Sequence, residues 1–189
     1  MTFSARERVR RAFAHALPGQ IADWNARVLA VALKTSVDGV YLGDDYGQQG
    51  GLLMSPAMWR AFIKPHLAAC IAQAHAAGKV VALHSCGNIL PILDDLVEIG
   101  LDAYQTVQPE VYDLDALKVR WGDRLVFWGG LSTQRDLTNL DLDGVRRLVH
   151  ETDAVLGRGG GYIAGPTHRI PPDVPPANIV ALIEALRGD

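Results

Sequence analysis

The chain has few cysteines, no long apolar run and no excess of positive charge. Only two cysteines occur in 189 residues, far fewer than a secreted disulfide scaffold carries, and this favours a reducing compartment. No stretch reaches the roughly 18 to 20 consecutive apolar residues that span a bilayer, and no apolar secretory segment follows the N-terminus. The formal net charge is −3, so no basic field attracts nucleic acid or anionic lipid. These absences predict a cytoplasmic protein that binds neither nucleic acid nor membrane.

Five short apolar runs alternate with longer helical patterns. The runs are near-continuously apolar, as strands buried on both faces are; they lie at 39–42, 80–83, 103–107, 125–128 and 162–164. The helical patterns, several of them bounded by capping residues, lie at 55–77, 88–99, 113–121, 142–156 and 176–187. This alternation predicts parallel strands joined by crossover helices.

The predicted fold is α/β, a partial TIM (β/α) barrel with about five parallel strands. A closed barrel of this type needs eight strands and typically about 250 residues, so strands are missing from the N-terminal side. An open doubly wound sheet is the alternative, but no glycine-rich fingerprint follows the first strand. The opening residues resemble two helices, from Ser4 to Leu17 and from Ile21 to Lys34. We therefore predict an N-terminal helical segment over 1–35 and a barrel portion over 36–189.

Polar side chains occur at the carboxyl ends of all five predicted strands, where parallel α/β folds bind their ligands. In chain order they are Asp44, Asp45 and Tyr46; His84, Ser85 and Cys86; Gln105, Thr106, Gln108 and Glu110; Ser132, Thr133 and Gln134; and Thr167 and His168. Because the carboxyl ends of parallel strands meet at one edge of the sheet, we expect a site there.

His84 and Cys86 are the pair in this set most suggestive of a metal. They lie two residues apart at a strand end, so both side chains can point the same way. Imidazole and thiolate suit zinc, and a catalytic zinc keeps three protein ligands and one open position. His168 is a candidate third ligand, with Asp44 or Asp45 as further candidates. The alternative is that Cys86 is a small buried residue and His84 donates a hydrogen bond to a neighbouring carboxylate.

Asp44, Asp45 and Tyr46 are candidate catalytic residues. One carboxylate can serve as a general acid or base, or bind a substrate cation or pyrrole N–H. Adjacent residues on a strand point to opposite faces, so at most one of the two is expected to face the site. Tyr46 offers a phenolic donor, although tyrosines at sheet ends are more often packing residues.

Several motifs, taken in order, resemble the uroporphyrinogen decarboxylase superfamily, which also contains the cobalamin-dependent and corrinoid-protein methyltransferases. They are Asp38-Gly-Val-Tyr-Leu-Gly-Asp-Asp-Tyr-Gly, His84-Ser-Cys-Gly, Phe127-Trp-Gly-Gly-Leu-Ser-Thr-Gln, and His168 with Pro175-Pro-Ala-Asn-Ile. The resemblance covers about residues 36 to 187 and implies the C-terminal part of a (β/α)8 barrel. The family segment that carries the arginine-rich clamp and the pyrrole-binding aspartate of the decarboxylases has no counterpart here.

The resemblance implies two enzyme functions. The superfamily's zinc methyltransferases bind metal through a His-x-Cys pair, matched by His84 and Cys86, and a later cysteine, where His168 stands instead. This implies zinc-dependent methyl transfer to a small-molecule substrate from a corrinoid donor, carried by a corrinoid protein. His168 also resembles the decarboxylase histidine at that place, which implies a carboxy-lyase of porphyrin biosynthesis that binds its tetrapyrrole with His168 and Asp44 or Asp45.

Three further side chains, Gln108, Glu110 and Gln134, are the candidate substrate-binding residues of either enzyme. A third hypothesis is a truncated, non-catalytic paralogue. An arc of five strands leaves two open edges and an exposed apolar interior, and self-association would cover both. This predicts a homo-oligomer.

Overall fold

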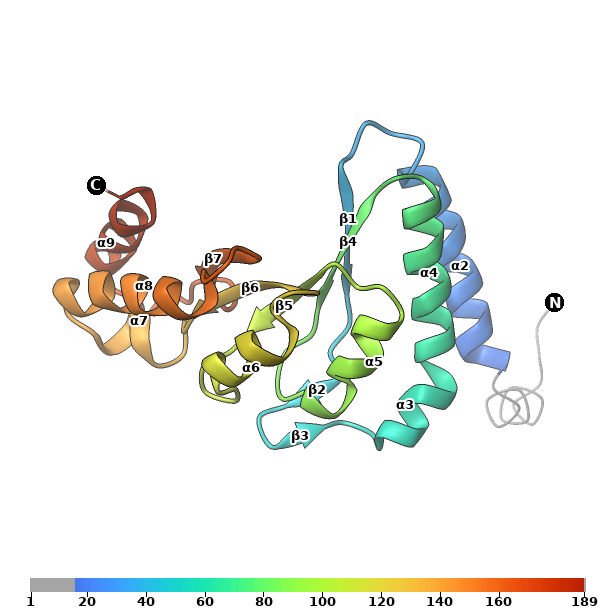
Figure 1. Cartoon of the computed structure of the whole chain (residues 1–189), viewed down its shortest axis with the longest axis horizontal. Helices are drawn as coiled ribbons and strands as arrows, with labels where there is room; N and C mark the ends of the chain where they lie inside the picture. Colours follow the sequence, from blue (N-terminus) through green and yellow to red (C-terminus); the bar gives the residue numbers. More distant parts are fainter. Residues whose placement is uncertain (1–15, 189) are drawn as a thin grey trace.

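The computed structural model describes residues 16–188 and shows an α/β fold built on one parallel sheet (Figure 1). The strands are β1 (Gly39–Gly43), β4 (Val80–His84), β5 (Ala103–Val107), β6 (Val126–Leu131) and β7 (Tyr162–Pro166). They pair in the order β1-β4-β5-β6-β7, all parallel. The α/β class and the five predicted strands are confirmed.

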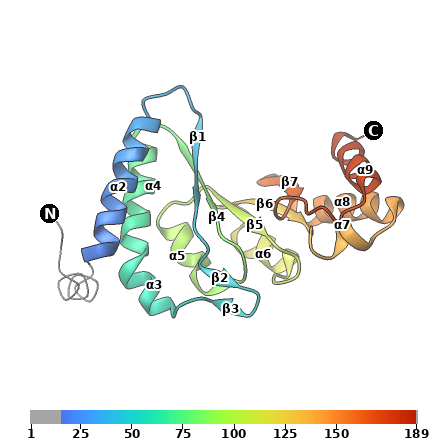
Figure 2. The same ribbon diagram turned by 180° about the vertical axis from the view of Figure 1, so that it is seen from behind.

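The described helices are α2 (Ala16–Ala32), α3 (Pro56–Phe62), α4 (Lys64–Ala76), η1 (Leu90–Ile92), α5 (Leu93–Glu98), α6 (Leu114–Trp121), α7 (Asp136–Asn139), α8 (Leu142–Leu156) and α9 (Pro176–Arg187). Helices between the strands form the crossover connections, while α2 precedes β1 and α9 follows β7. Helices α2 and α4 run side by side at the β1 end of the sheet, and α8 and α9 lie at its β7 end, as Figure 1 and Figure 2 both show. Among the described helices, none combines the length and hydropathy that a membrane span requires.

Two predicted helices are shorter or divided. The pattern over 55–77 forms two helices, α3 and α4, which meet at Ile63 because Pro65 lies in the first turn of α4 and has no amide hydrogen to continue α3. The pattern over 88–99 begins as a 3₁₀ turn at Leu90. There the side-chain oxygen of Asn88 accepts a hydrogen bond from the Leu90 amide at 3.1 Å, so Asn88 stands before the first turn.

The predicted break between the first two helices is also wrong where the structure describes it. Helix α2 spans Ala16–Ala32 without interruption, so it is helical at 18–20, where the sequence predicted a break. The rest of the helix expected from Ser4 lies outside the described residues. The small hairpin of β2 (Gly47–Gln48) and β3 (Gly51–Leu52) and the short helix α7 were not predicted.

One face of the sheet is buried under the helices and the other is open. Val81 and Leu83 of β4 point into the helix-covered core, together with Tyr104 and Phe127 from the next two strands. The opposite face, here called the inner face, exposes 53% of Tyr41, 59% of Val80 and 46% of Ile163. In a closed barrel these inner side chains would pack against one another. Within residues 16–188 the strands form an arc that leaves them uncovered.

Candidate metal centre

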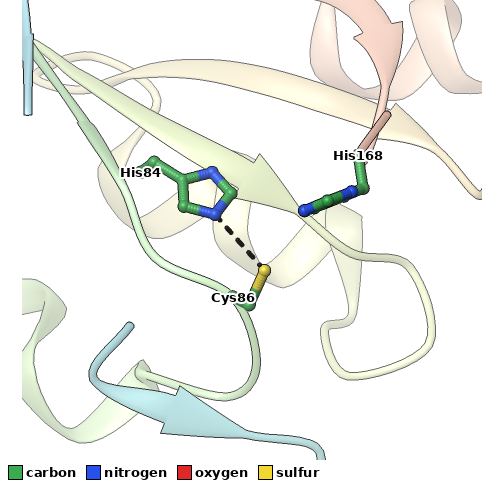
Figure 3. A group of neighbouring side chains, drawn as sticks. All are labelled: His84, Cys86 and His168. Atoms are coloured by element: carbon green, nitrogen blue, oxygen red, sulfur yellow. Dashed lines mark hydrogen bonds between the residues drawn. The ribbon is translucent and has the colours of Figure 1, made fainter. Parts of the chain in front are cut away.

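Two strand ends bring three potential metal ligands together (Figure 3). His84 is the last residue of β4, Cys86 follows two positions later, and His168 lies just after β7. The Nε2 atom of His84 is 3.3 Å from the Sγ atom of Cys86. One ligand atom from each of the three residues lies within 4.8 Å of the other two. Such a set of two imidazoles and a thiol can hold one metal ion.

The loop that carries Cys86 is held by buried hydrogen bonds. The Ser85 hydroxyl accepts from the amide of Tyr46 at 2.9 Å. The amide of Gly87 donates to the side-chain oxygen of Gln108 at 2.7 Å, and the Gly87 carbonyl accepts from the Tyr112 hydroxyl at 2.7 Å. Gly87 itself has a φ of +73°, a conformation that favours glycine. The position of Cys86 is therefore set by its neighbours on both sides.

Of the two adjacent aspartates, Asp45 faces this centre. Its Oδ1 atom accepts from the Cys86 amide at 2.8 Å and lies 3.5 Å from the Nε2 atom of His84. Asp44 instead lines a cleft of about 780 Å³ between β1 and helices α2 to α4. Burial there, and then the negative charge of Asp45, raise the pKa of Asp44.

The thiol of Cys86 has a raised pKa. Burial is the main cause and the carboxylate of Asp45 adds to it, and together they raise the pKa of Cys86 to about 11. The thiol is therefore protonated near neutral pH when no metal is bound. A metal ion has to displace that proton on binding, because the thiolate is the ligand.

Comparison with known proteins identifies the family. The chain matches the uroporphyrinogen decarboxylase (URO-D) family model over residues 8–188. It belongs to that family. Methylcobamide:CoM methyltransferase MtaA of Methanosarcina barkeri is 30% identical over 133 residues, which are 70% of this chain and 37% of that protein. Uroporphyrinogen decarboxylase of Coxiella burnetii is 24% identical over 177 residues, 92% of this chain and 47% of that protein.

A solved structure supports the same assignment. The methyltransferase from Methanosarcina mazei superposes with a TM-score of 0.69 at 25% identity, over 88% of this chain and 47% of that one. The chain thus spans less than half the length of these relatives. URO-D family proteins with these names include both a decarboxylase and methyltransferases, so the family alone leaves the reaction open.

The other predicted site residues of this URO-D family chain are not among the three clustered ligands. Tyr46 is buried with its ring against Trp59, the ring centroids 5.7 Å apart, and burial raises the pKa of its hydroxyl. Gln108 is buried and supports Gly87, as described above. Glu110 accepts a hydrogen bond from the Ser132 hydroxyl. The side chain of Gln134 is exposed to solvent.

The structure adds two residues to the centre that were not among the candidate catalytic, substrate-binding or metal residues. Gln105 lies on the inner face in register with His84, and its side-chain oxygen contacts the Nδ1 atom of that histidine. Tyr41, on the edge strand β1, donates a hydrogen bond to the same oxygen at 2.7 Å. In the sequence, the only indication for Gln105 is that a polar residue stands at a strand end. Nothing in the sequence distinguishes Tyr41 from an ordinary strand residue.

Proposed function

We propose that His84, Cys86 and His168 hold a zinc ion with one open position, and that the chain activates a small-molecule thiol or oxygen for methyl transfer from a corrinoid donor. The observation that carries the proposal is the convergence of one thiol and two imidazoles within 4.8 Å. The similarity to a methylcobamide:CoM methyltransferase supports it, because that name states a corrinoid donor and a thiol acceptor.

The donor atoms fit zinc chemically. Tetrahedral zinc with bonds of about 2.0 to 2.3 Å separates its ligand atoms by roughly 3.3 to 3.7 Å, and the 3.3 Å between His84 Nε2 and Cys86 Sγ agrees with this. His168 is exposed, so its ring can turn without displacing core side chains. A zinc ion at this place supplies a Lewis acid that lowers the pKa of a substrate thiol.

The chain's own groups have distinct roles in this proposal. Asp45 anchors the Cys86 amide and is the carboxylate beside His84, so it is placed to take a proton from the arriving substrate. His168, at the exposed side of the centre, is the ligand nearest to the solvent from which a substrate enters. Asp44 lies toward the cleft and Tyr46 packs in the core, so neither has a chemical step in this proposed function.

Metal analysis tests the proposal directly. Protein purified without added metal is expected to carry about one equivalent of zinc, and His84→Ala or Cys86→Ser less than about a tenth. His150→Ala, which removes an exposed histidine of α8, is the matched control and keeps the metal. Wild-type protein with less than about a tenth of an equivalent, unable to take up added zinc, contradicts the proposal.

Porphyrinogen decarboxylation is the second candidate. It is favoured by the similarity to uroporphyrinogen decarboxylase over 92% of the chain and by the position of His84, which lies close to both Asp45 and His168 at the carboxyl ends of the strands. The same protein, freed of metal with a chelator, separates the two functions. Turnover of uroporphyrinogen without metal supports the decarboxylase, whereas its absence together with zinc-dependent methyl transfer excludes it.

We propose separately that the chain self-associates. This proposal applies equally if the chain is a non-catalytic paralogue. It rests on the exposed inner face and on the two outer strands β1 and β7, each with one neighbour within residues 16–188. Sedimentation is expected to show a dimer or larger assembly. Val80→Lys places a charge on the inner face and should shift the equilibrium toward the monomer, while Val119→Lys, at an exposed position of α6, should not. A stable wild-type monomer at all concentrations contradicts the proposal.

A further inference from the structure

The side chain of Gln105 makes contacts in two directions across the inner face. Its Oε1 atom accepts a hydrogen bond from the Tyr41 hydroxyl at 2.7 Å and contacts the Nδ1 atom of His84. Its Nε2 atom donates to the carbonyl oxygen of Thr167 at 3.4 Å. Gln105 is 7% exposed, so water competes little with these partners. One buried amide thus joins the strand of the first ligand to the residue that precedes His168.

These partners determine which end of the amide is oxygen. The Tyr41 hydroxyl and an imidazole nitrogen can both donate, and the Thr167 carbonyl can only accept. The amide must therefore turn its oxygen toward His84 and its nitrogen toward Thr167. A carbonyl oxygen has no proton to give, so the hydrogen between it and His84 belongs to the Nδ1 atom.

The consequence for His84 is a defined tautomer. With the proton on Nδ1, the lone pair of the neutral ring lies on Nε2. Nε2 is the atom that lies 3.3 Å from the Sγ atom of Cys86, within the group of three ligands. The hydrogen bond made by one ring nitrogen commonly selects the nitrogen that binds metal and fixes the plane of the ring.

Tyr41 orders Gln105 from the edge of the sheet. It pairs in register with Ala82, whose small side chain leaves room above β4 for the tyrosine ring to reach Gln105 on the next strand. The ring is also supported by Trp128, with ring centroids 5.5 Å apart, and lies 6.3 Å from the ring of His84. The hydroxyl of Tyr41 is therefore held where it can fix the amide.

We propose that Gln105, ordered by Tyr41, is a positioning residue that holds the His84 ring with its proton on Nδ1 and its Nε2 lone pair directed at the ligand centre. The role in metal binding rests on the proposed function. The tautomer of His84 is a property of the chain alone and is measurable without metal.

The first test measures that tautomer in metal-free protein. Long-range ¹H–¹⁵N spectra at about pH 8.5, above the usual titration range of histidine, distinguish Nδ1–H from Nε2–H, and His84→Ala identifies the signal. Wild type and Gln105→Glu, which keeps an acceptor, are expected to show Nδ1–H. Gln105→Leu should shift the proton toward Nε2, and Tyr41→Phe should give a mixture. An unchanged Nδ1–H signal in Gln105→Leu overturns the proposal.

The second test measures the metal site with cobalt(II) and zinc. Gln105→Leu is expected to weaken zinc binding roughly 10- to 100-fold and to change the cobalt(II) absorption bands, with substantial recovery in Gln105→Glu. Gln73→Leu removes another partly buried glutamine hydrogen bond, to Ala26 in the helix layer, and should change neither. If Gln105→Leu has the zinc affinity and the cobalt(II) absorption bands of wild type, the role of Gln105 in metal binding is overturned. A wild type that binds no metal refutes the proposed function, while the tautomer result stands separately.

Discussion

Replacing Gly87 with alanine is expected to abolish tight zinc binding and to lower the free energy of unfolding by about 2 to 5 kcal/mol. The residue has a φ of +73°, and an added Cβ would lie 2.5 Å from the Gln48 amide nitrogen and the Gly47 carbonyl carbon. Both are backbone atoms of the hairpin beneath the loop, so neither can move aside cheaply. Either the hairpin or the loop that carries Cys86 has to shift.

Chemical denaturation and zinc content measure this effect. Gly50→Ala is the matched control, because Gly50 lies in the same hairpin, has no left-handed φ and has open space where the new methyl group would stand. The control should unfold like wild type and bind zinc equally. If Gly87→Ala matched the control in both measurements, the loop would not be constrained as described.

Truncating Tyr104 to alanine is expected to cost about 3 to 5 kcal/mol of stability, as for other large buried aromatic residues. Its ring is fully buried between the sheet and the helices, and its hydroxyl donates to the Ser85 carbonyl at 3.0 Å beside the Tyr112 hydroxyl. Tyr104→Phe keeps the ring but leaves that carbonyl without this partner, and is expected to cost about 1 to 2 kcal/mol.

Equilibrium unfolding of both variants separates the ring from the hydroxyl. Trp24→Ala removes a similarly large ring from an exposed position on α2 and should change stability little. A phenylalanine variant as unstable as the alanine variant would show that the hydroxyl network, and not ring packing, holds this part of the core. A smaller loss in Tyr104→Phe agrees with the burial seen here.

Strand positions and the place of the site were predictable from local patterns. The apolar run Val81, Ala82 and Leu83 predicted a strand correctly. Its predicted burial on both faces was wrong within the described residues, because the inner face of β4 leaves Val80 59% exposed. Because parallel strands end at a common edge, His84 and His168 were expected to meet although 84 positions of sequence numbering separate them. The structure places them in one group with Cys86.

Details that depend on direction and register were not predictable. Alternation ends where β1 ends, at Gly43, so it could not tell which of Asp44 and Asp45 turns toward Cys86. The core position of Tyr46 depends on a tertiary contact, the packing of its ring against Trp59 of α3. The division of the helix at Ile63 had a visible signal in Pro65, whereas strands of two residues such as β2 are too short to form a pattern.

The residues themselves specified that strands and helices alternate, that zinc-type donors stand at two strand ends, and that five strands fall short of a closed barrel. Periodicity and residue chemistry are local properties, so they can be interpreted without knowing which strands pair in the tertiary structure. Which atoms face one another was decided by the pairing of β1, β4 and β5, which places Tyr41 and Gln105 beside His84. That information lies in the register between strands, because a shift of one residue would turn each of these side chains to the opposite face.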